Sequence, residues 1–287
     1  MERIILKAPA KINFTLDVKG KREDGYHDIR SIMHTISLYD YITVDVEKEH
    51  NCKEIIINGN SDEIPYDERN LAWKAANAFL EKANICQAKV AVYIDKKIPV
   101  AAGLAGGSTD AAAVLKGLNE VYENILSEQQ IHEICSKLGS DLNFCFRGGC
   151  AICSSRGEKI QSLPYLELPI SVVKPKNFGI SAKEAYEEFD KQDKLTESSS
   201  TEKLLYLILR GDFDSSLISN DLEKPLCDKY NQLKNIKRFL KNSNMTGSGP
   251  TFFVVDKKLD VIFEPDEFTV HEHLETAPGG IEVIARQ

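Results

Sequence analysis

The chain has 287 residues, of which 42% are hydrophobic and 28% charged, and its formal net charge is −8. This length allows a substantial buried core and favours two domains, whereas the acidic balance argues against nucleic-acid or anionic-membrane partners. No apolar run approaches the roughly 20 residues of a membrane span, no leader peptide precedes the first strand-like run, and the seven cysteines follow no secreted disulfide pattern. We therefore expect a cytoplasmic protein with no membrane or nucleic-acid partner and no evident obligate protein partner.

The first half of the chain is predicted to mix strands and helices. Alternating or continuous apolar residues predict strands over residues 12–18, 42–46, 54–58 and 89–94. Helices are expected over residues 71–83, with Asn70 as the N-cap, and from 109 to about 122. Ser127 and Gln130 form a capping box for a further helix that Gly139 ends. An apolar strand is then expected around residues 142–146.

A second set of elements follows Gly157. Strands are predicted over residues 170–173, 251–255 and 281–285, and helices over 182–189, 202–209, 229–240 and once more before the last strand. Residues 191–203 are polar, and residues 196–201 within them are expected to form a loop or linker. Because strands and helices are mixed without strict βαβ alternation, we expect an α+β fold. The predicted domains are residues 1–157 and 158–287.

Residues 99–109 form a loop of small side chains that runs into a predicted helix. Backbone N–H groups can approach an anion closely in such a loop, and the helix dipole favours negative charge there. The spacing matches neither a Walker loop nor a dinucleotide-binding fingerprint. The loop therefore predicts a polyphosphate site, with a turn whose glycines serve packing alone as the alternative. The candidate polyphosphate-binding residues are Pro99, Val100, Ala101, Ala102, Gly103, Leu104, Ala105, Gly106, Gly107, Ser108 and Thr109.

Three other segments could complete a phosphoryl-transfer site. Residues 9–13 place Lys11 and Asn13 at the start of an alternating strand, Asp141 lies in a turn after a helix, and residues 245–250 form a second glycine turn. Phosphoryl transfer to an alcohol needs an anion cradle, a cation and a carboxylate that accepts the hydroxyl proton. Each segment also has an ordinary structural explanation, so the prediction depends on their combination.

Other polar residues give weaker signals. The basic residues that could line an anion pocket are Lys7, Lys11, Lys96 and Lys97. Cys150 and Cys153 match a C-x-x-C pattern, but they lie in an apolar strand-like run and are interpreted as small core residues. Residues 271–273 are interpreted as exposed polar residues rather than metal ligands.

The order of residues 9–13, 99–109 and 245–250 resembles the three motifs of the GHMP small-molecule kinases, over residues 7 to about 255. Within that superfamily, Asp24-Gly25-Tyr26-His27-Asp28 and the wording of the glycine loop resemble one branch. That branch phosphorylates the 2-hydroxyl of a cytidine diphosphate-linked methylerythritol in non-mevalonate isoprenoid biosynthesis. The resemblance implies a small-molecule substrate, with ATP and Mg²⁺ as cofactors. It also implies an N-terminal domain with a left-handed βαβ crossover, a C-terminal ferredoxin-like domain and a substrate cleft between them.

Carried onto this sequence, the resemblance implies Lys11 and Asp141 as the catalytic pair, with Asp141 as the base. Asn13 would bond to the acceptor, Tyr26 would stack on cytosine, and His27 would read the polar edge of that base. The loop would wrap the ATP phosphates and Asn70 would lie near the adenine. A hydroxyl at the helix start makes Ser108 a candidate Mg²⁺ contact, and Phe178 is a candidate for the second wall of the cytosine pocket. The family usually has proline where this chain has Asn143, so the segment that carries Asp141 lacks the stiffening of a proline ring.

Three other functions stay open at this point. A related kinase of homoserine or mevalonate would have no nucleobase for Tyr26 and His27 to recognise. A non-catalytic nucleotide-binding regulator would commonly have lost Lys11 or Asp141. A decarboxylase that phosphorylates its substrate only transiently would release CO₂.

Overall fold

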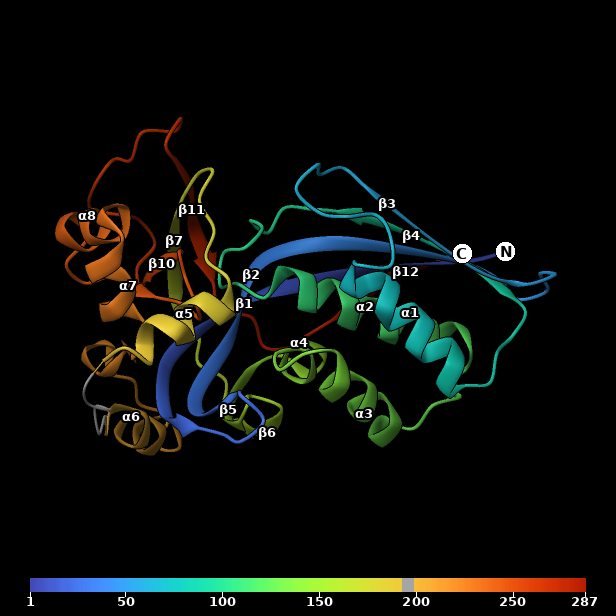
Figure 1. Cartoon of the computed structure of the whole chain (residues 1–287), viewed down its shortest axis with the longest axis horizontal. Helices are drawn as coiled ribbons and strands as arrows, with labels where there is room; N and C mark the ends of the chain where they lie inside the picture. The colour runs from blue at the N-terminus through green and yellow to red at the C-terminus, as the bar shows by residue number, and fades with distance from the viewer. Residues whose placement is uncertain (193–198) are drawn as a thin grey trace.

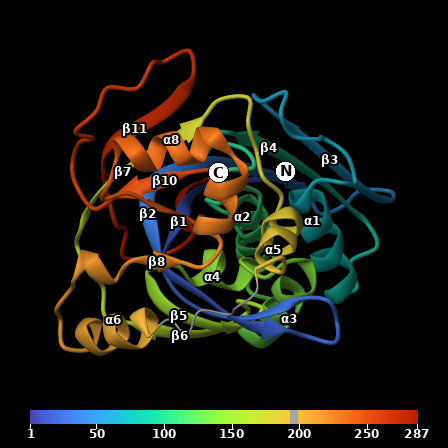
Figure 2. The same cartoon turned by 60° about the vertical axis from the view of Figure 1, so that its left-hand side comes forward.

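The computed structural model describes residues 1–192 and 199–287, and it is built on two β-sheets (Figure 1). The order along the larger sheet is β12 (Glu282–Arg286), β1 (Glu2–Lys21), β2 (His27–Glu47), β4 (Ala88–Asp95) and β3 (Lys53–Gly59). Three more strands attach beside this path: β5 (Cys150–Ser155) pairs with β2, β6 (Lys159–Leu163) pairs with β5, and β8 (Ser219–Asn220) pairs with β1. The long, bent β1–β2 hairpin places its tip beside β5 and β6 (Figures 1 and 2).

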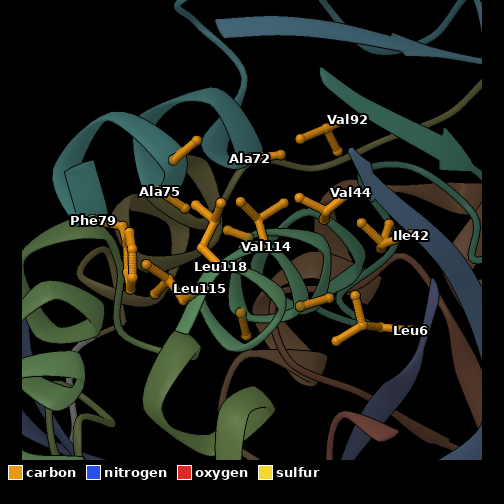
Figure 3. Packing of buried hydrophobic residues seen from close by; sticks show 14 of the residues in the cluster. Leu6, Ile42, Val44, Ala72, Ala75, Phe79, Val92, Val114, Leu115 and Leu118 are labelled. Atoms are coloured by element: carbon orange, nitrogen blue, oxygen red, sulfur yellow. The ribbon is translucent and has the colours of Figure 1, made fainter. Parts of the chain in front are cut away.

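Four helices cover one face of the larger sheet (Figure 1). They are α1 (Leu71–Lys82), α2 (Gly106–Val121), α3 (Glu128–Leu138) and α4 (Leu142–Arg147). Figure 3 shows Val114, Leu115 and Leu118 of α2 packed between α1 and the strands. These side chains are fully buried, and each such burial contributes about 1.5–3 kcal/mol relative to exposure. This core fixes α2, and therefore the loop before it, against the sheet.

The smaller sheet has the order β11 (Phe268–Glu275), β7 (Pro169–Pro175), β10 (Phe252–Val254) and β9 (Asn244–Met245). The helical segments of this half are α5 (Ala182–Phe189), α6 (Ser200–Ile208), η1 (Ser215–Leu217), α7 (Glu223–Lys229) and α8 (Asn231–Phe239). A second core joins β7 and β10 to α5, α7 and α8. Parallel strands β3 and β4, joined through α1, form a βαβ unit in the larger sheet; the hand of this crossover stays a prediction.

The last strand returns to the first sheet. β12 pairs with β1, so the two chain ends lie side by side (Figure 1). Ile281, just before β12, is 4% exposed and belongs to the core beneath α1 and α2. Among the described residues, no helix has the length and apolarity that a membrane crossing requires.

Two predicted elements are wrong in type. Residues 142–146 were expected as a strand but form α4, because a short buried apolar run does not distinguish the two conformations. Gly148, at a φ of 66°, ends that helix. The helix expected before the last strand is absent from the described residues there, and β11 lies at that place instead, antiparallel to β7.

Other predicted elements differ in their bounds. The helix expected from residue 109 begins three residues earlier, at Gly106. The helix expected over residues 229–240 is α8, and α7 precedes it without having been predicted. Part of the loop expected over residues 196–201 lies outside the described residues, but Ser200 and Thr201 belong to α6, where Thr201 is fully buried.

Candidate active site

A cavity of about 930 Å³ lies where the glycine loop, the β1–β2 hairpin and α5 meet. Its lining includes Lys11, Tyr26, Asp141 and Tyr186, together with most of the loop before α2. These residues come from both halves of the chain. The cavity is therefore a meeting point of segments that are far apart in the sequence.

The glycine loop turns sharply before α2. Ala101, Gly103 and Ala105 all have positive φ angles, of 49°, 71° and 59°. A Cβ on Gly103 would also lie 2.3 Å from the carbonyl oxygen of Thr246, so glycine is required there for close backbone packing. The 16-residue helix α2 then begins at Gly106 without a side-chain cap. Its first N–H groups are thus left to donate hydrogen bonds to a ligand.

Most of the predicted loop residues line the cavity, but two do not. The side chains of Leu104 and Thr109 are buried in the protein, with exposures of 1% and 0%. A Cβ added to Gly107 would meet only Leu71, at 3.8 Å. The space beside Gly107 is therefore open for a ligand.

Lys11 lies at the centre of the polar groups in the cavity. Its ammonium donates to Asn13 Oδ1 at 2.7 Å and lies 3.6 Å from Asp141 Oδ2. Lys11 is 3% exposed, whereas the Asp141 side chain is 29% exposed. The carboxylate therefore has a buried cation on one side and the cavity on the other.

Asp141 precedes α4 at the N-cap position, yet its side chain makes no capping hydrogen bond. An aspartate at this position commonly accepts from the N–H groups of the first turn. Here the carboxylate is left to pair with Lys11 instead. It is thus available to a ligand in the cavity.

Direct contacts join the three predicted motifs. The Lys11 N–H donates to the carbonyl of Leu104 in the glycine loop at 3.1 Å. The Asn13 N–H donates to Thr246 Oγ1 in the second glycine turn at 3.0 Å. Asn220 holds that turn by donating to the carbonyls of Met245 and Gly247. The predicted convergence of these motifs on one site is observed.

The other end of the cavity is aromatic. Tyr26 is 53% exposed, and the Arg156 guanidinium lies 4.8 Å from the centre of its ring. His27 is 7% exposed and stacks on Tyr186 with 4.7 Å between ring centres. Its Nε2 lies 2.7 Å from Asp190 Oδ1; because a carboxylate only accepts, Nε2 carries the proton. Burial raises the pKa of the Tyr186 phenol, so that ring stays neutral.

A buried ionic cluster supports the other side of the glycine loop. The Lys96 ammonium lies 2.5 Å from Asp40 Oδ2 and 2.8 Å from Asp110 Oδ2 in the first turns of α2. Burial opposes the charge on Lys96, but the two carboxylates outweigh it and raise its pKa. Burial raises the pKa of Asp110, while the Lys96 ammonium favours its ionised form. The cluster thus keeps a cation beside the start of α2 and at the cavity wall.

Comparison with known proteins assigns the family. The model of the GHMP kinases N terminal domain matches residues 70–149. A 4-diphosphocytidyl-2-C-methyl-D-erythritol kinase of Caldicellulosiruptor bescii is 43% identical over 256 residues, which cover 86% of this chain and 87% of that protein. The chain belongs to this kinase family. It is an ATP-dependent small-molecule kinase with the GHMP kinase fold.

Solved structures agree with this assignment. A crystal structure of 4-(cytidine 5'-diphospho)-2C-methyl-D-erythritol kinase superposes with a TM-score of 0.71 at 29% identity and covers 90% of each chain. Homoserine kinase from Cytophaga hutchinsonii also gives 0.71, at 16% identity, with 98% of this chain and 97% of that chain covered. The second likeness shows the shared fold alone.

The kinase holds some predicted residues away from the cavity. Asn70 caps α1 by accepting from the Ala72 N–H and donates to the carbonyl of Pro65, so its amide is already engaged. Phe178 packs against Tyr230 at 5.0 Å, whereas Tyr186 lines the cavity, as Tyr26 does. The sequence offered no signal for Tyr186 beyond its place on a predicted helix.

Of the basic and cysteine residues singled out in the sequence, only some lie at the cavity. Of the four lysines, Lys11 and Lys96 line the cavity, while Lys7 pairs with Glu282 and Lys97 with Asp95. Cys150 and Cys153 are buried in β5, and burial raises the pKa of both thiols. They are core residues, as predicted.

Proposed function

We propose that this kinase transfers the γ-phosphoryl group of ATP to the 2-hydroxyl of 4-diphosphocytidyl-2-C-methyl-D-erythritol, with Lys11 and Asp141 as its catalytic residues. The observation that carries the proposal is the pairing of these two side chains at 3.6 Å within one cavity. The same cavity has a backbone anion cradle at one end and an exposed aromatic ring at the other. These ends match the triphosphate and the nucleobase of the two substrates.

In the proposed reaction the acceptor hydroxyl oxygen attacks the γ-phosphorus as the bond to the β–γ bridging oxygen breaks, and ADP leaves. Asp141 accepts the hydroxyl proton, which its partial exposure to the cavity permits. Lys11 stabilises the ionised carboxylate and offsets negative charge that develops on the transferred group. Asn13 Oδ1 holds the Lys11 ammonium in place, and Asn13 lines the cavity beside the acceptor.

The nucleotide is proposed to bind along residues 99–109, with its phosphates against the start of α2. The open space at Gly107 and the uncapped N–H groups of the helix support this placement. Lys96 is a further candidate contact, because it lines the cavity although it was predicted only as one of four possible cations. Asn70 would act near the adenine indirectly, by fixing the start of α1.

The residues around the cavity fit a magnesium ion whose ligands are mainly the phosphate oxygens of the nucleotide. No cluster of three or more His, Cys, Asp or Glu side chains able to hold a metal occurs among the described residues. Magnesium commonly keeps only one or two protein ligands beside substrate phosphates. Ser108, at the start of α2 and on the cavity wall, would be such a ligand. When bound, the ion would neutralise charge on the phosphates.

The cytosine is proposed to stack on Tyr26, with Tyr186 in place of Phe178 as the opposite wall. Tyr26 presents an exposed ring to the cavity, and Tyr186 lines the same space. The Nε2 of His27 is engaged by Asp190. Only Nδ1 and the backbone of His27 are therefore left to read the polar edge of the base.

A coupled ADP-release assay tests the function. The cytidine diphosphate substrate, homoserine and mevalonate are offered in parallel, and mass spectrometry locates the phosphate on the product. We expect turnover with the first acceptor alone and a phosphate at its 2-hydroxyl. Comparable turnover of another acceptor, or release of CO₂, would contradict the proposal. We also infer a cytoplasmic location, in keeping with seven free cysteines.

A further inference from the structure

Asn143 is a buried polar residue that the proposed reaction does not use. It is 2% exposed, lies in the first turn of α4 and follows Asp141 by two residues. It does not line the cavity. A buried amide must find hydrogen-bond partners inside the protein or destabilise it.

The hydrogen-bond partners of the Asn143 side chain lie outside its own helix. The His132 Nδ1 of α3 donates to Asn143 Oδ1 at 2.9 Å. The Asn143 Nδ2 donates to Ser136 Oγ at 2.8 Å and to the carbonyl of Glu158 at 3.2 Å. Because a carbonyl only accepts, the amide nitrogen faces Glu158 and the amide oxygen faces His132. The orientation of the side chain is therefore determined by its partners.

Helix α4 needs such an anchor. It has six residues, and Asp141 gives it no side-chain cap. Its apolar side chains Leu142, Phe144 and Cys145 are buried, but the hydrophobic effect is non-directional, whereas hydrogen bonds have a preferred direction. Hydrogen bonds from Asn143 to α3 and to the turn before β6 fix the rotation of α4 about its axis, and with it the direction of the Asp141 carboxylate.

We propose that Asn143 is a positioning residue for the phosphoryl transfer, which holds the carboxylate of Asp141 toward Lys11 through its hydrogen bonds to His132, Ser136 and Glu158. The inference rests on the proposed function, in which Asp141 accepts the proton. A displacement of about 1 Å in a reacting group can cost 10²-fold in rate. Loss of this anchor therefore lowers turnover and leaves both substrates bound.

The test compares Asn143→Ala with a matched buried asparagine. Asn119 is 9% exposed and hydrogen-bonds to the backbone of Leu126 from α2, but it does not line the cavity, and its side-chain hydrogen bonds go to Asn124 and Leu126 rather than to α4. Turnover, both KM values and calorimetric ATP affinity are measured below the melting midpoints of all variants. We expect kcat of Asn143→Ala to fall about 10- to 100-fold with ATP affinity unchanged. Asn119→Ala should lower the midpoint and keep kcat within about twofold.

His132→Ala keeps the test decisive should Asn143→Ala fail to fold. It removes one of the three partners, so we expect a smaller loss of kcat, again without a change in either KM. The double variant should be no slower than Asn143→Ala, because His132 acts through Asn143. An unchanged kcat in His132→Ala, or a kcat of Asn143→Ala equal to that of Asn119→Ala, overturns the proposal.

Asp141→Asn is assayed alongside to separate this inference from the proposed function. An inactive Asp141→Asn enzyme together with a fully active Asn143→Ala enzyme overturns the positioning role alone. An active Asp141→Asn enzyme overturns the assignment of the base, and the positioning role with it.

Discussion

Asp141 is the residue at which a catalytic and a structural role give different results. Asp141→Asn keeps the shape of the side chain but cannot accept the hydroxyl proton. We expect kcat to fall by at least about 10²-fold, since a general base typically contributes 10²–10⁴-fold, while the KM for ATP and the thermal midpoint stay near those of the wild type. Steady-state kinetics and thermal melting measure both.

Asp45→Asn is a suitable control, because Asp45 also pairs with a cation, Arg3, but lies away from the cavity. Lys11→Met should lose as much activity as Asp141→Asn. The double variant should lose much less than the product of the two losses, because the pair acts as one unit. A nearly active Asp141→Asn enzyme would leave positioning and phosphate electrostatics to carry the reaction. A strongly destabilised one would indicate a structural role.

Tyr26 is the residue that tests the proposed binding of the cytidylyl acceptor. Base stacking on an aromatic ring contributes about 1–3 kcal/mol, so Tyr26→Ala should raise the KM for the cytidylyl substrate by about 5- to 150-fold. The KM for ATP should stay nearly unchanged. Both constants come from initial-rate measurements with the other substrate saturating.

Tyr206 is a matched control for Tyr26. It is 60% exposed and has Arg210 over its ring at 5.5 Å, much as Arg156 covers Tyr26, but it does not line the cavity. Tyr206→Ala should therefore change neither KM. If Tyr26→Ala weakens ATP as much as the cytidylyl substrate, the pocket assignment is wrong.

Single residues differ in how far the sequence could place them. Lys11 and Asp141 belong to recognisable motifs, and the structure brings them together as predicted. Tyr186 has no motif around it, and its place on the cavity wall follows from how α5 docks on His27. The contacts of Asn143 could not be predicted either, because they depend on the packing of α3 against α4.

At the scale of elements, the sequence predicted helix starts correctly where residues close in the sequence supply the capping hydrogen bonds. Asn70 caps α1, and Ser127 with Gln130 forms the capping box of α3, as predicted. Residues 142–146 and β11 were assigned wrongly, since tertiary pairing decides the conformation of short apolar or mixed runs. β11 exists as a strand because β7 offers it an edge.

The loop before α2 is the element on which the proposed nucleotide binding depends. Gly107→Val puts bulk into the space that the phosphates need, and we expect ATP affinity to fall at least about tenfold while the fold persists. In Gly106→Ala the new Cβ would lie 2.8 Å from Lys96 Nζ and 3.1 Å from Ile98 Cγ2. That variant should also weaken ATP, by displacing the buried cation. Isothermal titration calorimetry measures both affinities.

Gly279→Ala serves as the control for these glycine variants. A Cβ at Gly279 would meet nothing within 4 Å, and the residue lies outside the cavity. Its ATP affinity should equal that of the wild type. If the ATP affinity of Gly106→Ala and Gly107→Val is also unchanged, the loop does not form the nucleotide site.

At the scale of the whole molecule, the site depends on contacts between distant parts of the chain. The Lys11 N–H donates to Leu104 and the Asn13 N–H to Thr246, and β12 closes the first sheet from the C-terminal end. Sequence order indicated that the motifs belong together but not that the last strand joins β1. The predicted division at residue 157 does not include this return of the chain.

Ile281 tests how far the two ends of the chain form one cooperative unit. It is 4% exposed within the core that contains α1, and Lys116 of α2 donates to its carbonyl at 2.8 Å. Ile281→Ala should cost about 2–5 kcal/mol, the usual loss for a buried isoleucine. Trp73 is the single tryptophan of the chain; it belongs to α1 and packs against the same core. Its fluorescence in a urea titration therefore reports on the unfolding of the first sheet.

The matched control is Ile262→Ala, because Ile262 is 93% exposed and such a change is usually within about 0.5 kcal/mol of neutral. We expect the Trp73 transition of Ile281→Ala to move to lower urea while that of Ile262→Ala stays in place. An unmoved Trp73 transition in Ile281→Ala would mean that β12 and its anchor do not stabilise the rest of the first sheet. A moved transition would mean that β12 is energetically part of the first sheet, because Ile281, which precedes β12, then stabilises the sheet against which α2 and the glycine loop are built.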